Sequence, residues 1–446
     1  MLEHVLSEVS RLSPHRLVGE VAAVKGLLVE CIGIEKALNV GARCEIEGLT
    51  AQNGVVPKII CEVVGFRENR VLLMPFSTLE GIGLGAKVTV LASESAMYPH
   101  DAWLGRVVNA LGQPMDSKGL LPKGDVPYRL RAEPPAAHTR QRVKGKIDLG
   151  IRAINTFLTC CRGQRMGIFA GSGIGKSILM SMLARYSQAD VNVIGLVGER
   201  GREVQEFIED DLGEEGLKRS VVVVATSSDP ALLRRQAAYV TLCVAEYFRD
   251  QGKNVLLIMD SVTRFATAQR EIGLSAGEPP TTKGFTPTVF SELPQLLERA
   301  GPGKQGQGSI TGMFSVLVDG DDNNEPISDA VRSIIDGHIV LDRPIAERGR
   351  FPAINVLKSV SRTMPDCNSE KENELVVNAR RLLSTYEDMA EMIRLGAYRR
   401  GTDPDVDRAI QFYPAIENFL RQRKDEHSDL ATGYGELASV LGVQWP

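Results

Sequence analysis

The stretch M-G-I-F-A-G-S-G-I-G-K-S, residues 166–177, organises the rest of the chain. Its first five residues form an apolar run typical of a buried strand, and three glycines alternate with other residues before Lys176 and Ser177. Apolar residues then recur at helical spacing from Ile178 to Tyr186. A strand, a glycine-rich turn and a helix that begins with Lys-Ser are the context of a phosphate-binding loop. The alternative, a glycine-rich turn with a surface lysine, leaves the flanking strand and helix unexplained.

The residue types of this loop suit the binding of nucleotide phosphates. Glycine lets backbone N–H groups approach a phosphate because no Cβ is in the way, and these groups form an anion site with the helix N-terminus. We expect Lys176 to reach the β- and γ-phosphates of ATP, and the Ser177 hydroxyl to hold Mg²⁺. The usual pattern begins with glycine, whereas this chain has Ala170 there. The candidate nucleotide-binding residues of the loop are Gly171, Ser172, Gly173, Ile174, Gly175, Lys176, Ser177 and Ile178.

Composition places the chain among ordinary globular proteins. Its 446 residues predict about three domains, and 43% apolar with 24% charged residues can build a large core. The net charge of −4 gives no global argument for nucleic acid or for an anionic membrane. The seven cysteines are odd in number and lack a C-x-x-C pair, which favours free thiols in a reducing cytosol. We expect no signal peptide and no membrane span, because no apolar run approaches about 18 residues.

The texture of the sequence predicts an α/β protein with four segments. Residues 1–15 hold a short amphipathic stretch, which either docks on this chain or binds another protein. Residues 16–95 contain short β-rich runs separated by Gly or Asn turns, which predict a small β-barrel with too few aromatic residues for base stacking. Residues 96–365, including a proline-rich connector at 96–150, predict a RecA-like P-loop ATPase domain with a parallel sheet. Residues 366–446 predict a helical domain.

Two carboxylates follow predicted strands of the central domain. The apolar run 255–259 ends in Asp260, the Walker B arrangement, and we expect Asp260 to hold Mg²⁺ through water. A second apolar run, 191–197, leads into Gly198 and Glu199, and a carboxylate there can orient the water that attacks the γ-phosphate. The alternatives are a buried strand that happens to end in Asp, and a solvated charged loop around Glu199.

Two later residues can complete a nucleotide site. Arg362 follows an extended segment, and an arginine inserted from a neighbouring subunit can stabilise the charge of the transition state, although a solvated or structural arginine is the alternative. Phe351 precedes Pro352 at a strand–turn, where its ring can stack on adenine or fill the core.

The combined motifs resemble those of the flagellar and virulence type III protein export ATPases, which are relatives of the catalytic subunits of rotary ATP synthases. The resemblance covers about residues 17–440. The motifs that carry it are LGRVVNALGQP (104–114), AGSGIGKS (170–177), GERGRE (198–203), DSVTRFA (260–266), GEPPTTKG (277–284), FSELP (290–294), GDD (320–322) with NEP (324–326), and SVSR (359–362).

This resemblance implies a set of roles. The glutamate that matches Glu199 is catalytic in the family, and we include the adjacent Arg200 with Lys176 and Arg362 among the candidate catalytic residues. The arginine that matches Arg362 acts in trans within a hexameric ring. The aromatic residue that matches Phe351 packs on adenine in rotary catalytic subunits, where it is usually tyrosine. Ala170 matches the type III export members, whereas rotary catalytic subunits usually carry glycine there.

The resemblance also implies partners and a process. It implies a Mg²⁺-dependent homohexamer that is cytoplasmic and peripheral to the inner-membrane export apparatus. Its partners are a regulatory protein at the N-terminal segment, a central stalk protein, the export-gate membrane complex, and export substrates with their chaperones. The acidic balance and the aromatic-poor barrel lead us to expect no nucleic-acid partner. The sequence favours the flagellar over the virulence system, while a rotary catalytic subunit, a non-catalytic nucleotide-binding subunit and a ring-shaped RNA translocase remain the alternatives.

Overall fold

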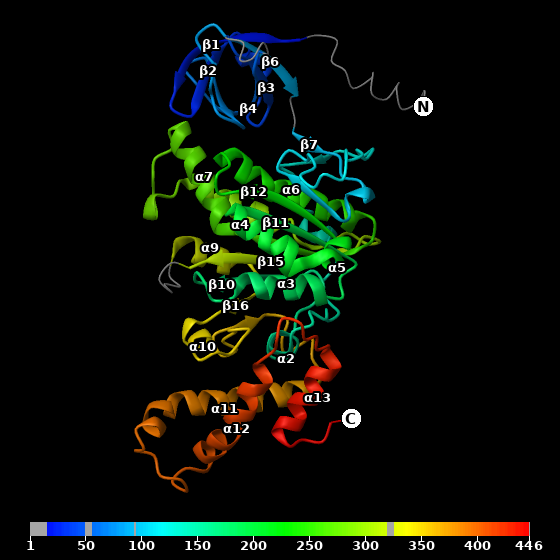
Figure 1. Cartoon of the computed structure of the whole chain (residues 1–446), viewed down its shortest axis with the longest axis vertical. Helices are drawn as coiled ribbons and strands as arrows, with labels where there is room; N and C mark the ends of the chain where they lie inside the picture. The colour runs from blue at the N-terminus through cyan, green and yellow to red at the C-terminus, as the bar shows by residue number, and fades with distance from the viewer. Residues whose placement is uncertain (1–15, 50–55, 93–94, 319–324, 446) are drawn as a thin grey trace.

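The computed structural model describes residues 16–49, 56–92, 95–318 and 325–445. The predicted amphipathic segment 1–15 lies outside the described residues. Figure 1 shows a barrel at one end of the long axis, a sheet covered by helices in the middle and a group of helices at the other end. This is the α/β architecture that the sequence predicts. Among the described helices, the structure shows none that is long and apolar enough to cross a membrane.

Six antiparallel strands close into the N-terminal barrel in the order β1-β2-β5-β4-β3-β6. Alternate side chains point inward. Cys44 of β3 lies directly opposite Cys61 of β4, and both side chains are buried inside the barrel. All seven cysteines are free, as the sequence predicts, and burial raises the pKa of the Cys31 and Cys44 thiols to about 12. The strands are β1 Val18–Lys25, β2 Leu28–Ile32, β3 Arg43–Glu47, β4 Lys58–Arg67, β5 Arg70–Pro75 and β6 Lys87–Ala92.

The central sheet has the strand order β17-β16-β10-β15-β13-β11-β12-β8. Every neighbouring pair along this path is parallel except β16 with β17. Because parallel strands end at the same edge, the loops after β10, β11 and β13 gather there. The strands are β8 Arg106–Asn109, β10 Arg165–Ala170, β11 Val191–Glu199, β12 Ser220–Thr226, β13 Asn254–Asp260, β15 Ser309–Leu317, β16 Gly337–Val340 and β17 Val360–Ser361, with β14 Gly301–Pro302 antiparallel to β15.

Helices cover both faces of this sheet, because its strands are apolar on both sides. One core contains the buried side chains of α2 and α3 with those of the C-terminal helices, and the other contains those of α6, α7, α8 and α9. The helices are α2 Arg152–Phe157, α3 Lys176–Tyr186, α4 Gly201–Glu206, the π-helical turn η4 Phe207–Leu212, α5 Gly213–Lys218, α6 Ala231–Asp250, α7 Val262–Ala276, α8 Pro287–Leu297, α9 Pro326–Ile334 and α10 Arg343–Glu347. The connector adds β7 Ala96–Met97 paired with β9 Tyr128–Arg129, and the short 3₁₀ turns are η1 Glu35–Ala37, η2 Asp101–Trp103, η3 Ala137–Thr139 and η5 Thr282–Gly284.

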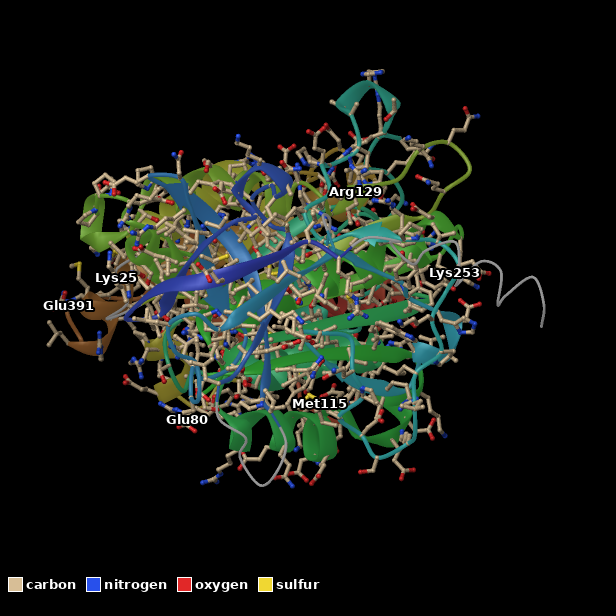
Figure 2. The ribbon with its side chains drawn as sticks, turned by 90° about the horizontal axis from the view of Figure 1, so that it is seen from above. Lys25, Glu80, Met115, Arg129, Lys253 and Glu391 are labelled. Atoms are coloured by element: carbon tan, nitrogen blue, oxygen red, sulfur yellow. The ribbon has the colours of Figure 1, made fainter. Side chains whose placement is uncertain are left out.

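The C-terminal helices are α11 Glu370–Arg394, α12 Pro404–Leu420 and α13 Leu430–Leu441. A capping box between Ser369 and Glu372 starts α11. The first half of α11 buries its apolar face in the same core as α3, whereas Met392 and Leu395 at its far end are exposed. Seen from the barrel end in Figure 2, Glu391 of α11 lies at the edge of the molecule on the side of Lys25 in the barrel.

The barrel packs directly on helices of the central domain. Leu72 of β5 and Phe76, which follows β5, form an apolar cluster with Leu232 of α6 and Ile272 of α7. The Arg67 guanidinium donates to the carbonyl of Ala276 at 3.0 Å, at the end of α7. The last backbone carbonyls of a helix have no hydrogen-bond partner within the helix. This contact therefore caps α7 and also joins it to the barrel.

Candidate nucleotide-binding and catalytic site

The phosphate loop runs from the end of β10 to the start of α3. Gly173 and Gly175 have positive φ values of 76° and 89°, in the region that side chains disfavour. Gly175 is the N-cap residue of α3, so the N-terminus of this helix opens onto the loop. The geometry is that of an anion site built from backbone N–H groups and a helix N-terminus.

Three neighbouring elements bring Lys176, Glu199 and Asp260 together. The ammonium of Lys176 donates to the Asp260 carboxylate, and it lies 3.6 Å from Oε1 of Glu199. The hydroxyl of Ser315, on β15, donates to Oδ1 of Asp260 at 2.6 Å. The Lys176 and Asp260 side chains are 11% and 4% exposed, so the group of charges is shielded from bulk water. The structure therefore assembles an acid–base cluster at the carboxyl edge of the sheet.

Glu199 has an unusual environment within this cluster. Burial raises the pKa of its carboxyl to about 7, with a further contribution from the negative charge of Asp260, while Lys176 acts in the opposite direction. Among the described residues, its buried Oε1 has no hydrogen-bond partner. An unsatisfied buried carboxylate oxygen is costly, so its position at this edge suits a water molecule or a ligand.

The other loop residues lie around the same opening. Ser177 is exposed in the first turn of α3, one residue after Lys176. Ile178 is 41% exposed and lies on the wall of an adjacent cavity. The guanidinium of Arg343, on α10, donates to the carbonyl of Ser172 at 3.2 Å. No spacing in the sequence points to Arg343 or to Ser315, because both come from elements distant in the chain.

A cavity of about 520 Å³ lies beside the start of α3. The ring of Phe351 is 44% exposed and lines this cavity together with Ile178 and Met182. Phe351 also faces the phosphate loop, since a Cβ on Gly175 would lie 3.5 Å from its Cδ1. An apolar slot next to a phosphate loop has the position that a nucleoside base needs.

Residues 421–425 form another part of the wall of this cavity. Sequence reasoning missed these residues. Gln422 holds this segment in place. Its backbone N–H donates to the carbonyl of Phe351 at 2.9 Å, and its buried amide bonds the N–H of Arg152 and the carbonyl of Gly150. A charged run between two helices carries no signal of such a role, because the contact is created by docking of the C-terminal helices.

Two predicted site residues lie away from the cluster in their own chain. Arg200 is the N-cap residue of α4, and its 76% exposed side chain pairs with Glu203 at 3.0 Å. Arg362 is exposed just after β17, with its guanidinium 3.4 Å from the carbonyl of Arg332. Ser361 pairs with Gly337 at the start of β16, which is the amino edge of the sheet. Arg362 thus lies at the edge opposite to the phosphate loop.

Comparisons with known proteins agree with this geometry. The model of the ATP synthase alpha/beta family nucleotide-binding domain matches residues 150–361, and that of the type III secretion EscN ATPase C-terminal domain matches residues 368–439. The flagellum-specific ATP synthase of Caulobacter vibrioides is 58% identical, with 100% of both chains covered. That of Bacillus subtilis is 51% identical, with 96% of each chain covered. The assembled ATPase EscN of enteropathogenic Escherichia coli superposes with a TM-score of 0.87 at 41% identity, covering 95% of this chain and 100% of that one.

The fold and the site define a P-loop nucleotide hydrolase with a parallel sheet. Lys176, Asp260 and Glu199 lie together beside the phosphate loop, where such an enzyme needs a cation and carboxylates. The chain belongs to the family of flagellum-specific ATP synthases and type III secretion ATPases. It is an ATP-hydrolysing enzyme of type III protein export, which confirms the fold and the enzyme class that the sequence predicts.

Proposed function

We propose that the chain forms a homohexameric ring that hydrolyses ATP, with Mg²⁺, at the contacts between its subunits and thereby energises flagellar protein export. The observation that carries this proposal is the division of the site. Lys176, Glu199 and Asp260 meet at one edge of the sheet, whereas Arg362 lies at the opposite edge of the same chain. In a ring, one subunit's carboxyl edge can meet another's arginine.

The residues at the carboxyl edge fit a magnesium ion. Mg²⁺ prefers oxygen ligands and usually keeps several waters, so two protein groups are sufficient. The Ser177 hydroxyl and the Asp260 carboxylate are the groups that would hold it. In this structure the Asp260 carboxylate accepts a hydrogen bond from the ammonium of Lys176. The bound ion would supply neutralisation of phosphate charge. The buried Oε1 of Glu199 next to these groups accepts no hydrogen bond among the described residues, which supports a site that takes up polar ligands.

Hydrolysis follows from the positions of this chain's own groups. The phosphate loop and Lys176 hold the β- and γ-phosphates of ATP, and Phe351 contacts the adenine in the adjacent cavity. Glu199 accepts a hydrogen bond from the attacking water and orients it toward the γ-phosphorus. Arg362 of the next subunit stabilises the charge on the transferring phosphoryl group, with Arg200 near the same contact. The products are ADP and phosphate.

The relatives support one of the proposed partners. EscN has been solved in complex with its central stalk EscO, which supports a stalk protein that contacts the exposed ends of α11 and α12. We place the enzyme in the cytoplasm at the inner-membrane export apparatus, where it acts on the export gate, on substrates and on their chaperones. The segment 1–15 would bind a regulatory partner. The match to flagellum-specific relatives over the whole chain favours the flagellar over the virulence system.

Mixed rings test the proposal. Lys176→Ala and Arg362→Ala should each abolish most ATP hydrolysis, and mixing the two variants should restore activity, because some contacts then combine an intact loop with an intact arginine. Random mixing in equal amounts gives about a quarter of such contacts in a closed ring. The measurement is the ATPase rate of co-refolded or subunit-exchanged rings.

A matched mixture provides the control. Lys176→Ala with Glu199→Gln places both defects on the same side of the contact, so this mixture should stay inactive. Absence of recovery in well-mixed Lys176→Ala and Arg362→Ala rings would contradict the action of Arg362 in trans.

A further inference from the structure

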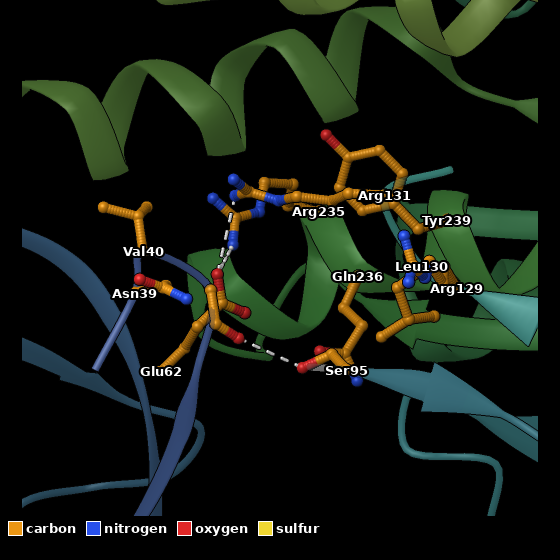
Figure 3. A pocket seen from close by; sticks show the side chains of 11 residues that line it. Asn39, Val40, Glu62, Ser95, Arg129, Leu130, Arg131, Arg235, Gln236 and Tyr239 are labelled. Carbon is orange, nitrogen blue, oxygen red and sulfur yellow. Dashed lines mark hydrogen bonds and ion pairs between the residues drawn. The ribbon is translucent and has the colours of Figure 1, made fainter. Parts of the chain in front are cut away.

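A second cavity, of about 230 Å³, lies between the barrel and the central domain. Figure 3 shows the residues that line it. Asn39 and Glu62 come from the barrel, Arg131 comes from the connector, and Arg235 and Gln236 come from α6. The volume is several times the roughly 30 Å³ that one water molecule occupies in the liquid. The cavity is separate from the nucleotide site and has no role in the chemistry described above.

Arginines converge on a single carboxylate at this joint. Arg235 donates to Oε1 of Glu62 at 2.6 Å, and Arg131 lies 3.5 Å from the same oxygen. Figure 3 shows both guanidinium groups beside Glu62. Arg43 is the direct cross-strand partner of Glu62 between β3 and β4, so its side chain lies on the same face of the barrel. The hydroxyl of Tyr239, on the cavity wall, donates to the carboxylate of Glu292. Among the described residues that line the cavity, Glu62 is the one carboxylate, and both Arg131 and Arg235 contact it.

Several polar atoms of this group lack partners among the described residues. These are Nε and Nη2 of Arg43, Nε of Arg235 and Oε1 of Gln236, all of them buried. The Arg235 side chain is 3% exposed and Gln236 is 2% exposed. The amide nitrogen of Gln236 donates to the carbonyl of Ala110 at 2.6 Å, which leaves its oxygen as the free acceptor. Burial lowers the pKa of Arg43, as expected for a cation that is incompletely compensated.

We propose that this cavity binds a phosphate-type oxyanion that still carries a proton, either hydrogen phosphate or the monoanion of a phosphomonoester, and that this anion bridges the barrel and α6. Buried guanidinium N–H groups without an acceptor are costly, and an oxyanion satisfies several such donors at once while it also neutralises the excess charge. Water can satisfy the donors but leaves the charge. The acceptor Gln236 adds selectivity, because the P–OH of hydrogen phosphate donates to it and the fully ionised sulfate has no proton to offer.

The test measures phosphate binding to full-length protein in which the nucleotide site is disabled. Titration calorimetry of Lys176→Ala with inorganic phosphate should show one bound equivalent per chain. Adding Arg43→Gln should weaken this binding at least about tenfold, because charge-assisted hydrogen bonds are lost. Adding Arg70→Gln should leave it unchanged, since Arg70 is an arginine of the same barrel that pairs with Glu30 instead. Sulfate should bind more weakly than phosphate.

A second variant guards against a folding defect. Arg131→Gln should weaken phosphate binding as Arg43→Gln does, and melting curves without phosphate show whether each variant is folded. If glycerol 3-phosphate displaces inorganic phosphate, the site accepts phosphomonoesters. If it does not, the ligand is free phosphate. The proposal is overturned if Lys176→Ala binds no phosphate, or if the folded Arg43→Gln and Arg131→Gln variants bind it as well as Arg70→Gln. Equal binding of sulfate would overturn the role of Gln236.

Discussion

Glu199 shows how the ionisation of one residue depends on its surroundings. Its carboxyl is buried beside Asp260, and both effects favour the protonated form, whereas Lys176 at 3.6 Å favours the carboxylate. The result is a pKa of about 7, compared with about 4.3 for glutamate in water. The proposed mechanism needs this group ionised to orient water, and near neutral pH it is only partly ionised in the nucleotide-free chain.

The pH dependence of hydrolysis follows from this value. Since the carboxylate is the active form, we expect kcat/KM for ATP to rise with pH and to level off above about 7, because kcat/KM reports ionisations of the free enzyme. Steady-state ATPase assays across this range give the measurement. Glu199→Gln should retain ATP binding, lose at least about a hundredfold in kcat, and lose this limb of the profile. A wild-type profile that is flat through neutrality would contradict the assignment.

Phe351 gives a second prediction for a single residue. Phe351→Ala should raise KM for ATP about tenfold with little change in kcat, because stacking on a base contributes about 1–3 kcal/mol to binding and does not act on the phosphates. Phe66→Ala is the control, since Phe66 is equally exposed, at 44%, but lies on the barrel. ATPase kinetics measure both variants. A fall in kcat with unchanged KM would instead indicate a packing role.

The elements differ in how strongly the local sequence specifies them. The strand, loop and helix at 165–186 were predicted because apolar periodicity and turn glycines agree there. The barrel strands also appear where short β-rich runs alternate with turns. The π-helical turn η4 and the two-residue strands β7, β9, β14 and β17 were not predicted, since such short elements depend on neighbours that the local pattern does not contain.

The start of α11 offers a test at this scale. Ser369→Ala removes the side chain that accepts from the N–H of Glu372, and we expect a loss of about 1 kcal/mol of local stability. Hydrogen exchange of the first turn should become about fivefold faster, because local opening reports this free energy. Ser384→Ala, an exposed change within the same helix, should have no such effect. Equal exchange in both variants would show that tertiary packing, and not the cap, holds this end.

The whole molecule joins three parts through specific contacts. Lys146 pairs with Glu372 at 2.6 Å between the central domain and α11, and Gln422 connects the C-terminal part to the wall of the nucleotide cavity. The barrel is held through an apolar cluster and through Glu62 with Arg235. A movement of the C-terminal helices would therefore reach the wall of the cavity beside the phosphate loop directly.

Assembly should govern activity at this largest scale. Arg362 lies at the edge of the sheet opposite to its own phosphate loop, so under the proposed mechanism an isolated chain lacks the arginine that its site needs. We expect the ATPase rate per chain to rise with protein concentration, in step with the measured mass of the particles, and Arg362→Ala to stay at least about 10³-fold below the assembled wild type. Full activity of a chain that remains monomeric at all concentrations would contradict this.

The sequence by itself determined the phosphate loop, the Walker B strand, the barrel, the parallel sheet and the helical C-terminal part, because periodicity, turn glycines and strand-ending acids are encoded by residues close together in the chain. Only the tertiary structure decided which distant residues meet. It placed Asp260 against Lys176, 84 residues away, and it added Ser315 and the segment 421–425 to the site. It also set Arg362 apart from the phosphate loop. The physical reason is that strand order and helix docking, which are set by burial of apolar surface across the whole chain, determine these distances.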